Sequence, residues 1–332
     1  DQEQEAGIAF RAVKEASMMK PMQEELLVHD LTERLAAIKR VKNSLSKTRA
    51  STVSGFGKTA SKNGKGKKTQ QEQSIAPIKP VFKDKEGYSS ILHENGVVRI
   101  NNVMPLSSAQ ALYSWTCEEK IASEKAIAEG IIDSRSRFTN ALLKKNRWDL
   151  LLPLEDSAVV MKGLYDTLVA NELLSSIITS RFGTSAELYE LGALISDPGS
   201  DRQVIHPDIP FTMQADDAPD TVPIITCFIA LQDIDADMGA TVFLPKTNTA
   251  EHHRLLKDPF LRDDMLQSLP NKLSTLGVGD CSIFDGRLLH AGGANETDKR
   301  RILFYFTFRN PALPDPRSAN NPGSIRPELK ER

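Results

Sequence analysis

The stretch CSIFDGRLLH, residues 281–290, contains two short apolar runs on either side of the turn signal Asp285-Gly286. Four more apolar runs of strand length follow Gly183, at residues 188–195, 222–232, 240–244 and 301–309. Turn-forming residues separate these runs, and no helix-length pattern lies between every pair. This order predicts an antiparallel barrel or jelly roll, mainly β with flanking helices, and it argues against a doubly wound parallel sheet.

The segment before these runs has helix start and stop signals. Residues 108–129 begin with a serine and end at Gly130, and residues 155–182 end at Gly183. We therefore expect one helix in each of these two segments.

The N-terminal quarter differs in composition from the rest of the chain. Residues 1–50 have the apolar spacing of an amphipathic helical extension, and residues 51–84 are typical of a flexible basic linker. We expect residues 85–332 to form the domain that carries the chemistry, with a proline-rich C-terminal tail. Because the chain begins with Asp1 and not Met, we interpret an upstream segment, such as a targeting sequence, as removed. The compartment is therefore unknown, and a plastid stroma is as compatible as the cytosol.

The overall composition excludes several classes of protein. The chain has 332 residues, 40% hydrophobic content and a formal net charge of −2, so nucleic acid is not the expected main partner. The longest strongly apolar stretch, residues 222–231, is about half the roughly 20 residues of a membrane span. The three cysteines are widely spaced in apolar context, which indicates reduced packing residues in a soluble protein from a reducing compartment.

A first candidate metal-binding pair is His206-Pro207-Asp208. In an extended chain, side chains two residues apart project from the same face, so one imidazole and one carboxylate can bind the same ion. The pair is a weak signal by itself, and a surface turn at Pro207 is the alternative interpretation.

His290 is a candidate third ligand because it closes an apolar strand. A histidine there must satisfy two ring nitrogens, which a metal and a hydrogen-bond partner can do, although a satisfied core histidine is the commoner case. With His206 and Asp208 it completes the set of two imidazoles and one carboxylate found in iron(II) oxygenases. His252 and His253 compete for this place, but their polar, helix-like context favours an exposed surface.

A candidate anion-binding residue lies in the strand that follows Arg300-Arg301. Residues 302, 304, 306 and 308 are all apolar and suit a face packed beneath helices, whereas residues 301, 303, 305 and 307 form a mixed set. Arg301 therefore points into the predicted cavity, where its guanidinium can bind a carboxylate through two hydrogen bonds, and Arg300 lies at the rim.

These motifs together resemble a known family. The residues that carry the resemblance are His206-Pro207-Asp208, Leu231-Gln232-Asp233, residues 238–245, Gly279-Asp280, residues 284–290, residues 292–295 and Arg301. They are similar to the phytanoyl-CoA dioxygenase-like (PhyH) family of Fe(II)/2-oxoglutarate-dependent oxygenases, over about residues 189–309. One departure is Lys246-Thr247-Asn248, where many relatives have Gly-Ser/Thr-His.

The resemblance implies a fold, cofactors and roles for four residues. The fold is a double-stranded β-helix (jelly roll, cupin-like), and the cofactors are Fe(II) and the co-substrate 2-oxoglutarate. His206, Asp208 and His290 are then the metal ligands, and Arg301 binds the distal carboxylate of 2-oxoglutarate. A carboxylate at position 208 favours hydroxylation or desaturation over halogenation, because halogenating relatives have a small residue there.

The implied reaction is oxidation of a small-molecule metabolite by dioxygen, with release of succinate and CO2. The alternative is a catalytically silent metal-binding or ligand-binding jelly roll that senses iron or oxygen. A cationic region before Trp148, with Arg135 and Arg137, is a candidate for recognising an anionic substrate group, and a solvated helix face is its equally weighted alternative.

Overall fold

The computed structural model describes residues 85–139, 145–152, 157–211 and 221–314. The extension and linker expected at residues 1–50 and 51–84 lie outside the described residues, as does the tail after residue 314. The helices are α3 (Lys85–Asn95), α4 (Leu106–Ala128), α5 (Ala158–Leu164), α6 (Glu172–Phe182), α7 (Ala250–Lys257) and α8 (Arg262–Ser268). The strands are β1 (Val97–Ile100), β2 (Arg147–Leu151), β3 (Glu187–Ser196), β4 (Ile224–Ala230), β5 (Thr241–Phe243), β6 (Lys272–Ser274), β7 (Cys281–Asp285), β8 (His290–Gly292) and β9 (Arg301–Arg309).

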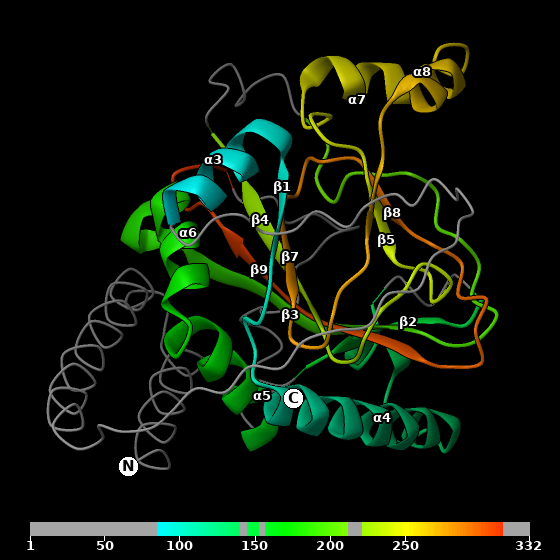
Figure 1. The fold of residues 1–332 in the computed structure, drawn as a ribbon. Coiled ribbons are helices and arrows are strands. Elements are labelled where there is room, and N and C mark those ends of the chain that lie inside the picture. Colours follow the sequence, from blue (N-terminus) through cyan, green and yellow to red (C-terminus); the bar gives the residue numbers. More distant parts are fainter. Residues whose placement is uncertain (1–84, 140–144, 153–156, 212–220, 315–332) are drawn as a thin grey trace, which may run out of the picture.

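The strands form two antiparallel sheets. The larger sheet has the order β1-β7-β4-β9-β3-β2, and the smaller has the order β6-β5-β8. Single bridges extend the smaller sheet, one of them between His206 and His290. The outer face of the larger sheet is covered by α4, α5 and α6, while α7 and α8 lie at the far end beyond the smaller sheet (Figure 1). This arrangement confirms the predicted mainly β jelly roll with flanking helices.

The alternation along β9 separates two hydrophobic cores, as its sequence predicts. Ile302, Phe304, Phe306 and Phe308 belong to the core between the larger sheet and the helices. Leu303 and Tyr305 belong to a second core between the two sheets, where they meet Phe243 of β5. The opposite face of β9 is thus directed into the interior of the jelly roll, as a cavity-lining face must be.

The helical region agrees with the expectation in part. The helix expected at residues 108–129 is α4, and Gly130 follows it with a φ of +72°. The single helix expected at residues 155–182 is instead broken into α5, a π turn at Tyr165–Val169, and α6. The break lies at Asn171, whose side-chain oxygen accepts from the Leu173 amide and so caps α6 in place of a continuing turn.

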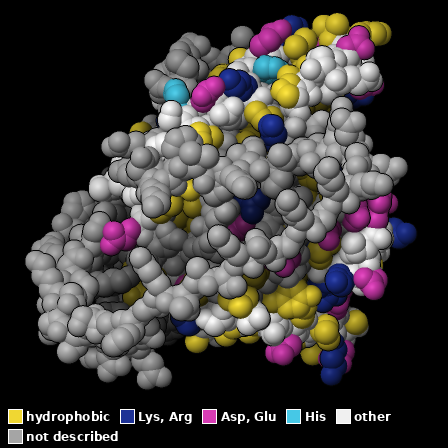
Figure 2. Space-filling model, viewed as in Figure 1, with side chains coloured by type: hydrophobic (Ala, Val, Ile, Leu, Met, Phe, Trp, Pro, Cys, Tyr) yellow, Lys and Arg dark blue, Asp and Glu magenta, His cyan; other side chains and the backbone are white. Residues whose placement is uncertain are grey.

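The described surface has mixed charge. Figure 2 shows acidic and basic side chains interspersed with hydrophobic ones on the visible face of the described residues. None of the helices in the described ranges combines the length and the apolar character needed to cross a membrane. The three cysteines are free thiols, and Cys227 and Cys281 are buried as expected of packing residues.

Candidate metal centre

Two segments of the chain, hydrogen-bonded side by side, carry the three candidate ligands. The amide of His206 donates to the carbonyl of His290 and the amide of His290 donates to the carbonyl of His206, each at 2.9 Å. Further along, the Ile209 amide donates to the Gly286 carbonyl at 3.0 Å. On its other side, His290 is paired with Phe243 of β5. The His-Pro-Asp segment therefore forms an extra edge of the smaller sheet, and this pairing brings residue 208 close to residue 290.

The three side chains converge. One ligand atom from each of His206, Asp208 and His290 lies within 4.8 Å of the others. The distance from His290 Nε2 to Asp208 Oδ1 is 3.5 Å, and the two imidazole ring centroids are 4.7 Å apart. Two ligands that each lie about 2.1 Å from one ion are no more than about 4 Å apart, so this spacing is close to that of a formed metal site.

Backbone hydrogen bonds fix the orientation of both imidazoles. The Nδ1–H of His206 donates to the Val204 carbonyl at 2.8 Å, and the Nδ1–H of His290 donates to the Leu288 carbonyl at 2.9 Å. In the neutral form of each ring, Nε2 then carries the lone pair and faces the shared centre. Burial lowers the pKa of His290, although the nearby Asp208 carboxylate opposes this, so the neutral ligand form is favoured there. Two imidazole nitrogens and one carboxylate on one side of an ion are the donor set that suits non-haem iron(II).

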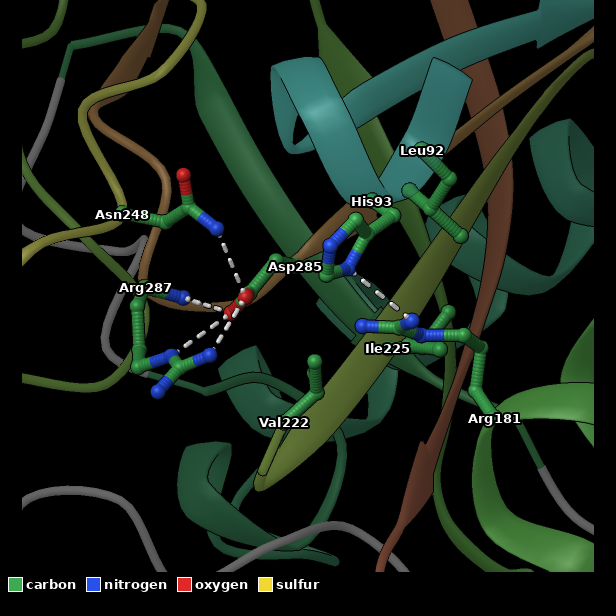
Figure 3. A pocket seen from close by; sticks show the side chains of 8 residues that line it. All are labelled: Leu92, His93, Arg181, Val222, Ile225, Asn248, Asp285 and Arg287. Atoms are coloured by element: carbon green, nitrogen blue, oxygen red, sulfur yellow. Dashed lines mark hydrogen bonds and ion pairs between the residues drawn. The ribbon is translucent and has the colours of Figure 1, made fainter. Parts of the chain in front are cut away.

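The turn before His290 is held by a buried ion pair (Figure 3). Arg287 donates through Nε and Nη2 to the two carboxylate oxygens of Asp285 at 3.1 and 2.8 Å, and both side chains are almost fully buried. Asn248 donates to the same carboxylate at 3.0 Å, while the Thr247 hydroxyl accepts from the Leu289 amide at 3.0 Å. The departure from the family pattern at residues 246–248 thus supplies its own contacts. Lys246 occupies a left-handed conformation, with a φ of +68°, at the place where many relatives have glycine.

Arg301 is buried in the interior without a carboxylate partner among the described residues. Its Nη1 donates to the Gly239 carbonyl and its Nη2 to Ser196 Oγ at 3.0 Å, but its Nε has no hydrogen-bond acceptor there. Arg147 of β2, also buried, donates to the same Ser196 hydroxyl at 2.9 Å. Burial, together with the neighbouring Arg147, lowers the pKa of Arg301 to about 9. Two buried guanidinium groups that share the hydroxyl of Ser196 are an arrangement suited to binding an anion.

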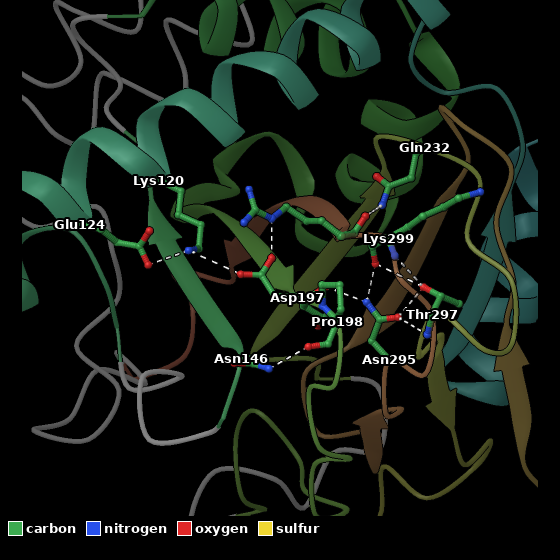
Figure 4. A network of polar contacts seen from close by, with 11 residues as sticks. Lys120, Glu124, Asn146, Asp197, Pro198, Gln232, Asn295, Thr297 and Lys299 are labelled. Carbon is green, nitrogen blue, oxygen red and sulfur yellow. Dashed lines mark hydrogen bonds and ion pairs between the residues drawn. The ribbon is translucent and has the colours of Figure 1, made fainter.

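Arg300 belongs to a polar network at the end of β3. Figure 4 shows other members of this network, among them Asp197 and Lys120. The Nε of Arg300 donates to Asp197, whose other carboxylate oxygen lies 3.5 Å from the Lys120 ammonium. Beside this pair, the Asn295 amide donates to the Ser196 carbonyl at 2.9 Å and to the Lys299 carbonyl at 2.8 Å. These contacts fix the start of β9 in the register that turns residue 301 inward and residue 300 outward, as the alternation predicts.

Acidic side chains adjoin the triad, and sequence reasoning missed them. Asp149 of β2 accepts from the Tyr305 hydroxyl at 2.9 Å and also from Thr139. Burial, with a smaller contribution from the charge of Asp208, raises the pKa of Asp149 to about 6 and that of Glu190 to about 8. A Cβ at position 192 would lie 2.5 Å from the Tyr305 ring, so only glycine leaves room for that ring. The interior therefore has a basic end at Arg301 and Arg147 and an acidic side near Asp208.

The structure does not bring every candidate residue to the triad. Arg137 forms an ion pair with Glu119 of α4, Arg135 is exposed in the turn at Ser134–Ser136, and neither has a contact with the triad within the described part of the chain. In the same region before Trp148, Arg147 lies in β2, whereas residues 140–144 lie outside the described part of the chain. The expectation of an exposed His253 is wrong, because only 3% of this residue is exposed.

Comparisons with known proteins agree with this architecture. Residues 92–303 match the family described as phytanoyl-CoA dioxygenase (PhyH). The chain is 25% identical over 241 residues to the dioxygenase FUM3 of Gibberella moniliformis, which covers 70% of this chain and 72% of that protein. It is 30% identical over 109 residues to the dioxygenase sphC of Aspergillus fumigatus, which covers 32% of this chain and 27% of that protein. This chain thus spans far less than two thirds of the length of sphC.

A solved structure supports the fold. AviO1 from Streptomyces viridochromogenes Tue57 aligns over 71% of this chain and 99% of its own length, with 14% identity and a TM-score of 0.51. The family match covers well over half of the sequence and contains both ligand segments and Arg301. This chain belongs to the phytanoyl-CoA dioxygenase (PhyH) family.

Proposed function

We propose that this chain is a non-haem Fe(II), 2-oxoglutarate-dependent dioxygenase that oxidises a small molecule and releases succinate and CO2. His206, Asp208 and His290 are the iron ligands in this proposal. The observation that carries it is the combination of a converging triad with a buried arginine, Arg301, that has no carboxylate partner among the described residues. A metal that binds both dioxygen and a 2-oxo acid needs open coordination positions and a fixed cation for the distal carboxylate.

The residues of this chain divide the work. Each imidazole is held by its Nδ1–H bond to a backbone carbonyl, so Nε2 is presented to the metal without rearrangement. Arg301 holds the distal carboxylate of 2-oxoglutarate, and Arg147 adds positive charge behind it. Bound iron supplies the activation of dioxygen, coupled to decarboxylation of the co-substrate. The aromatic rings of Phe228, Phe243 and Phe284 around His290 exclude water from the oxidant.

The acidic side of the interior indicates a substrate class. Asp149 and Glu190 offer carboxyl oxygens near Asp208 and lack a cationic partner among the residues that influence their pKa values. We infer that the substrate presents hydrogen-bond donors, such as hydroxyl or ammonium groups, towards them. The carboxylate at position 208 leaves hydroxylation as the expected outcome and desaturation as its alternative.

The test separates turnover from binding. Anaerobic addition of Fe(II) and 2-oxoglutarate should produce the weak visible absorption of an iron chelate, and oxygen should then release succinate in a screen of hydroxylated and amino metabolites. A chelate that forms without any succinate across the screen would support the silent binding protein instead. Failure to form the chelate would exclude the proposed dioxygenase.

A further inference from the structure

A buried histidine outside the triad joins the two segments that carry the ligands. His253 is the one fully buried side chain of α7, a helix whose other described side chains are partly or fully exposed. Its Nδ1 lies 2.9 Å from the amide nitrogen of Phe211, and its Nε2 lies 2.7 Å from the carbonyl oxygen of Arg287. Phe211 is three residues after Asp208, and Arg287 is three residues before His290.

The two contacts determine the protonation of this ring. The Phe211 amide can only donate, so Nδ1 must carry a lone pair, and the Arg287 carbonyl can only accept, so Nε2 must carry the hydrogen. His253 is therefore a neutral imidazole in a single tautomer. Burial lowers its pKa, which agrees with this assignment.

The bond to Phe211 continues a ladder along the His-Pro-Asp segment. The segment is paired with its neighbour at His206–His290 and at Ile209–Gly286, and His253 supplies the next connection, at Phe211. The Phe211 ring also packs edge-on against the imidazole at 5.9 Å between centroids. Without this acceptor, the amide of the partly buried Phe211 would lose its hydrogen bond to the imidazole, a loss that favours detachment of the segment.

Asp208 depends on this backbone for its position. Within the described part of the chain, its carboxylate has no hydrogen bond, and its recorded polar contact is with His290 Nε2 at 3.5 Å. A carboxylate ligand that no neighbouring side chain orients must be placed by the main chain on either side of it. Within the described part of the chain, the backbone just after residue 208 is held by the hydrogen bond of Ile209 to Gly286 and by that of Phe211 to His253. The bond at Phe211 is the farther of the two from Asp208 along the chain.

We infer that His253 is a positioning residue for the metal centre, which holds the His-Pro-Asp segment through the Phe211 amide and thereby fixes the Asp208 carboxylate. This inference rests on the proposed function, because it assigns His253 a role towards the iron site. The hydrogen bond from the Phe211 amide holds the His-Pro-Asp segment. The hydrogen bond to the Arg287 carbonyl keeps the proton on Nε2, so that Nδ1 is free to accept from Phe211.

Two substitutions separate the two contacts. In His253→Asn the side-chain oxygen lies near the former Nδ1 position and can accept from Phe211, whereas in His253→Gln the side-chain amide reaches the former Nε2 position and can donate to Arg287. His253→Leu fills a similar volume with neither contact. His252→Asn is the matched control, because among the described residues the hydrogen bonds of His252 are with the hydroxyl of Thr249, the N-cap of the same helix.

The experiment measures binding of Fe(II) alone under anaerobic conditions, by titration and by the rise in Tm on adding the metal. His253→Gln and His253→Leu should bind Fe(II) about 10- to 100-fold more weakly, as removal of residues that orient metal ligands typically does, while His253→Asn and His252→Asn stay within about threefold of the unmodified protein. The rise in Tm on adding Fe(II) should be smaller for His253→Gln and His253→Leu than for the unmodified protein.

Other outcomes decide against the inference. If His253 only fills space, Leu would retain the metal affinity and Asn would lose it, which reverses the predicted order. Equal losses for Asn and Gln would show that the Phe211 contact is not the one that matters. His206→Ala is the reference for the metal site itself: if it binds Fe(II) as the unmodified protein does, the proposed function fails. If only the His253 variants bind normally, the function stands and this inference fails.

Discussion

Replacement of Arg301 by methionine should weaken the binding of 2-oxoglutarate and should maintain or raise the free energy of unfolding. Arg301 is 2% exposed, lies beside Arg147 and has no carboxylate partner among the described residues, so the chain without co-substrate carries an uncompensated buried cation. Burial is the chief cause that lowers the pKa of Arg301 from its ordinary value to about 9. At about 1.4 kcal/mol per unit this shift corresponds to a cost on the order of 5 kcal/mol at most.

The expected gain in the free energy of unfolding is smaller than this upper limit on the cost of the buried cation. Apolar replacement of buried ionic groups has stabilised proteins by about 1–4 kcal/mol, and loss of the hydrogen bond to the Gly239 carbonyl offsets about 1 kcal/mol. We expect the free energy of unfolding without co-substrate to hold or rise by up to about 3 kcal/mol, at roughly 2–4 °C of Tm per kcal/mol. A lowered pKa means that the cost is fully present below about pH 9 and declines as the pH rises from there towards the ordinary pKa of arginine, so the gain should be constant near neutrality.

Binding of 2-oxoglutarate should change in the opposite direction. Loss of a buried charged partner costs about 3–5 kcal/mol, which is roughly two to four powers of ten in affinity. The control is Arg300→Met. The ion pair of Arg300 with Asp197 is partly exposed, with 24% and 19% of the two side chains accessible. We therefore expect its loss to change the free energy of unfolding by about 0–1 kcal/mol and to leave the binding of 2-oxoglutarate nearly unchanged. The assays are thermal unfolding without co-substrate and anaerobic titration with 2-oxoglutarate. A larger loss of 2-oxoglutarate affinity in Arg300→Met than in Arg301→Met would refute the assignment of Arg301 to the distal carboxylate. A Tm lower by more than about 5 °C in Arg301→Met would refute the argument that the buried Arg301 cation lowers stability.

Three further predictions concern the triad, the acidic side of the interior and the N-terminal region. His206→Ala, Asp208→Ala and His290→Ala should each abolish iron-dependent succinate release yet keep a cooperative unfolding transition, and turnover in His290→Ala would contradict the ligand set. Glu190 keeps its proton up to about pH 8 in the folded chain and loses it near 4.5 when unfolded, so its ionisation lowers stability as the pH rises through that window. Glu190→Gln should therefore have a higher Tm than the metal-free unmodified protein near pH 8 and a similar one near pH 5; a constant difference would contradict the burial of this carboxyl. Deletion of residues 1–84 should retain Fe(II) binding, because the family match begins at residue 92, and an insoluble product would show that the deleted region supports the domain.

The sequence predicts the parts of this fold that depend on local periodicity. The alternation along residues 301–309 places Phe304 and Phe306 beneath the helices and Arg301 inside, because a strand with one face buried against helices admits one register. The short strands β1, β2 and β6 were not predicted, since three to five residues carry too little periodic signal to distinguish a strand from a loop.

The candidate site is predictable only where its residues form a motif. The His-Pro-Asp segment and His290 could be found from spacing and context, and the structure brings them together. Arg147, Asp149 and Glu190 belong to no motif, because their proximity to the site results from strand pairing between β2, β3 and β9. His253 was misjudged because its immediate neighbours Glu251, His252 and Arg254 are all polar, and a single buried residue leaves no periodic trace.

The two halves of the proposed site stand on different sheets. The metal ligands belong to the edge of the smaller sheet, and Arg301 belongs to β9 of the larger one. The spacing between them is set by the core that fills the gap, in which Phe243 of the smaller sheet meets Phe284 of the larger at 5.0 Å between ring centroids. If the 2-oxo acid spans from the metal to Arg301, we expect this aromatic layer to set the length of the carbon chain that fits between them. A substitution at Phe243 or Phe284 would then change whether a 2-oxo diacid of five or of six carbons binds better, while the three ligands and Arg301 stay unchanged.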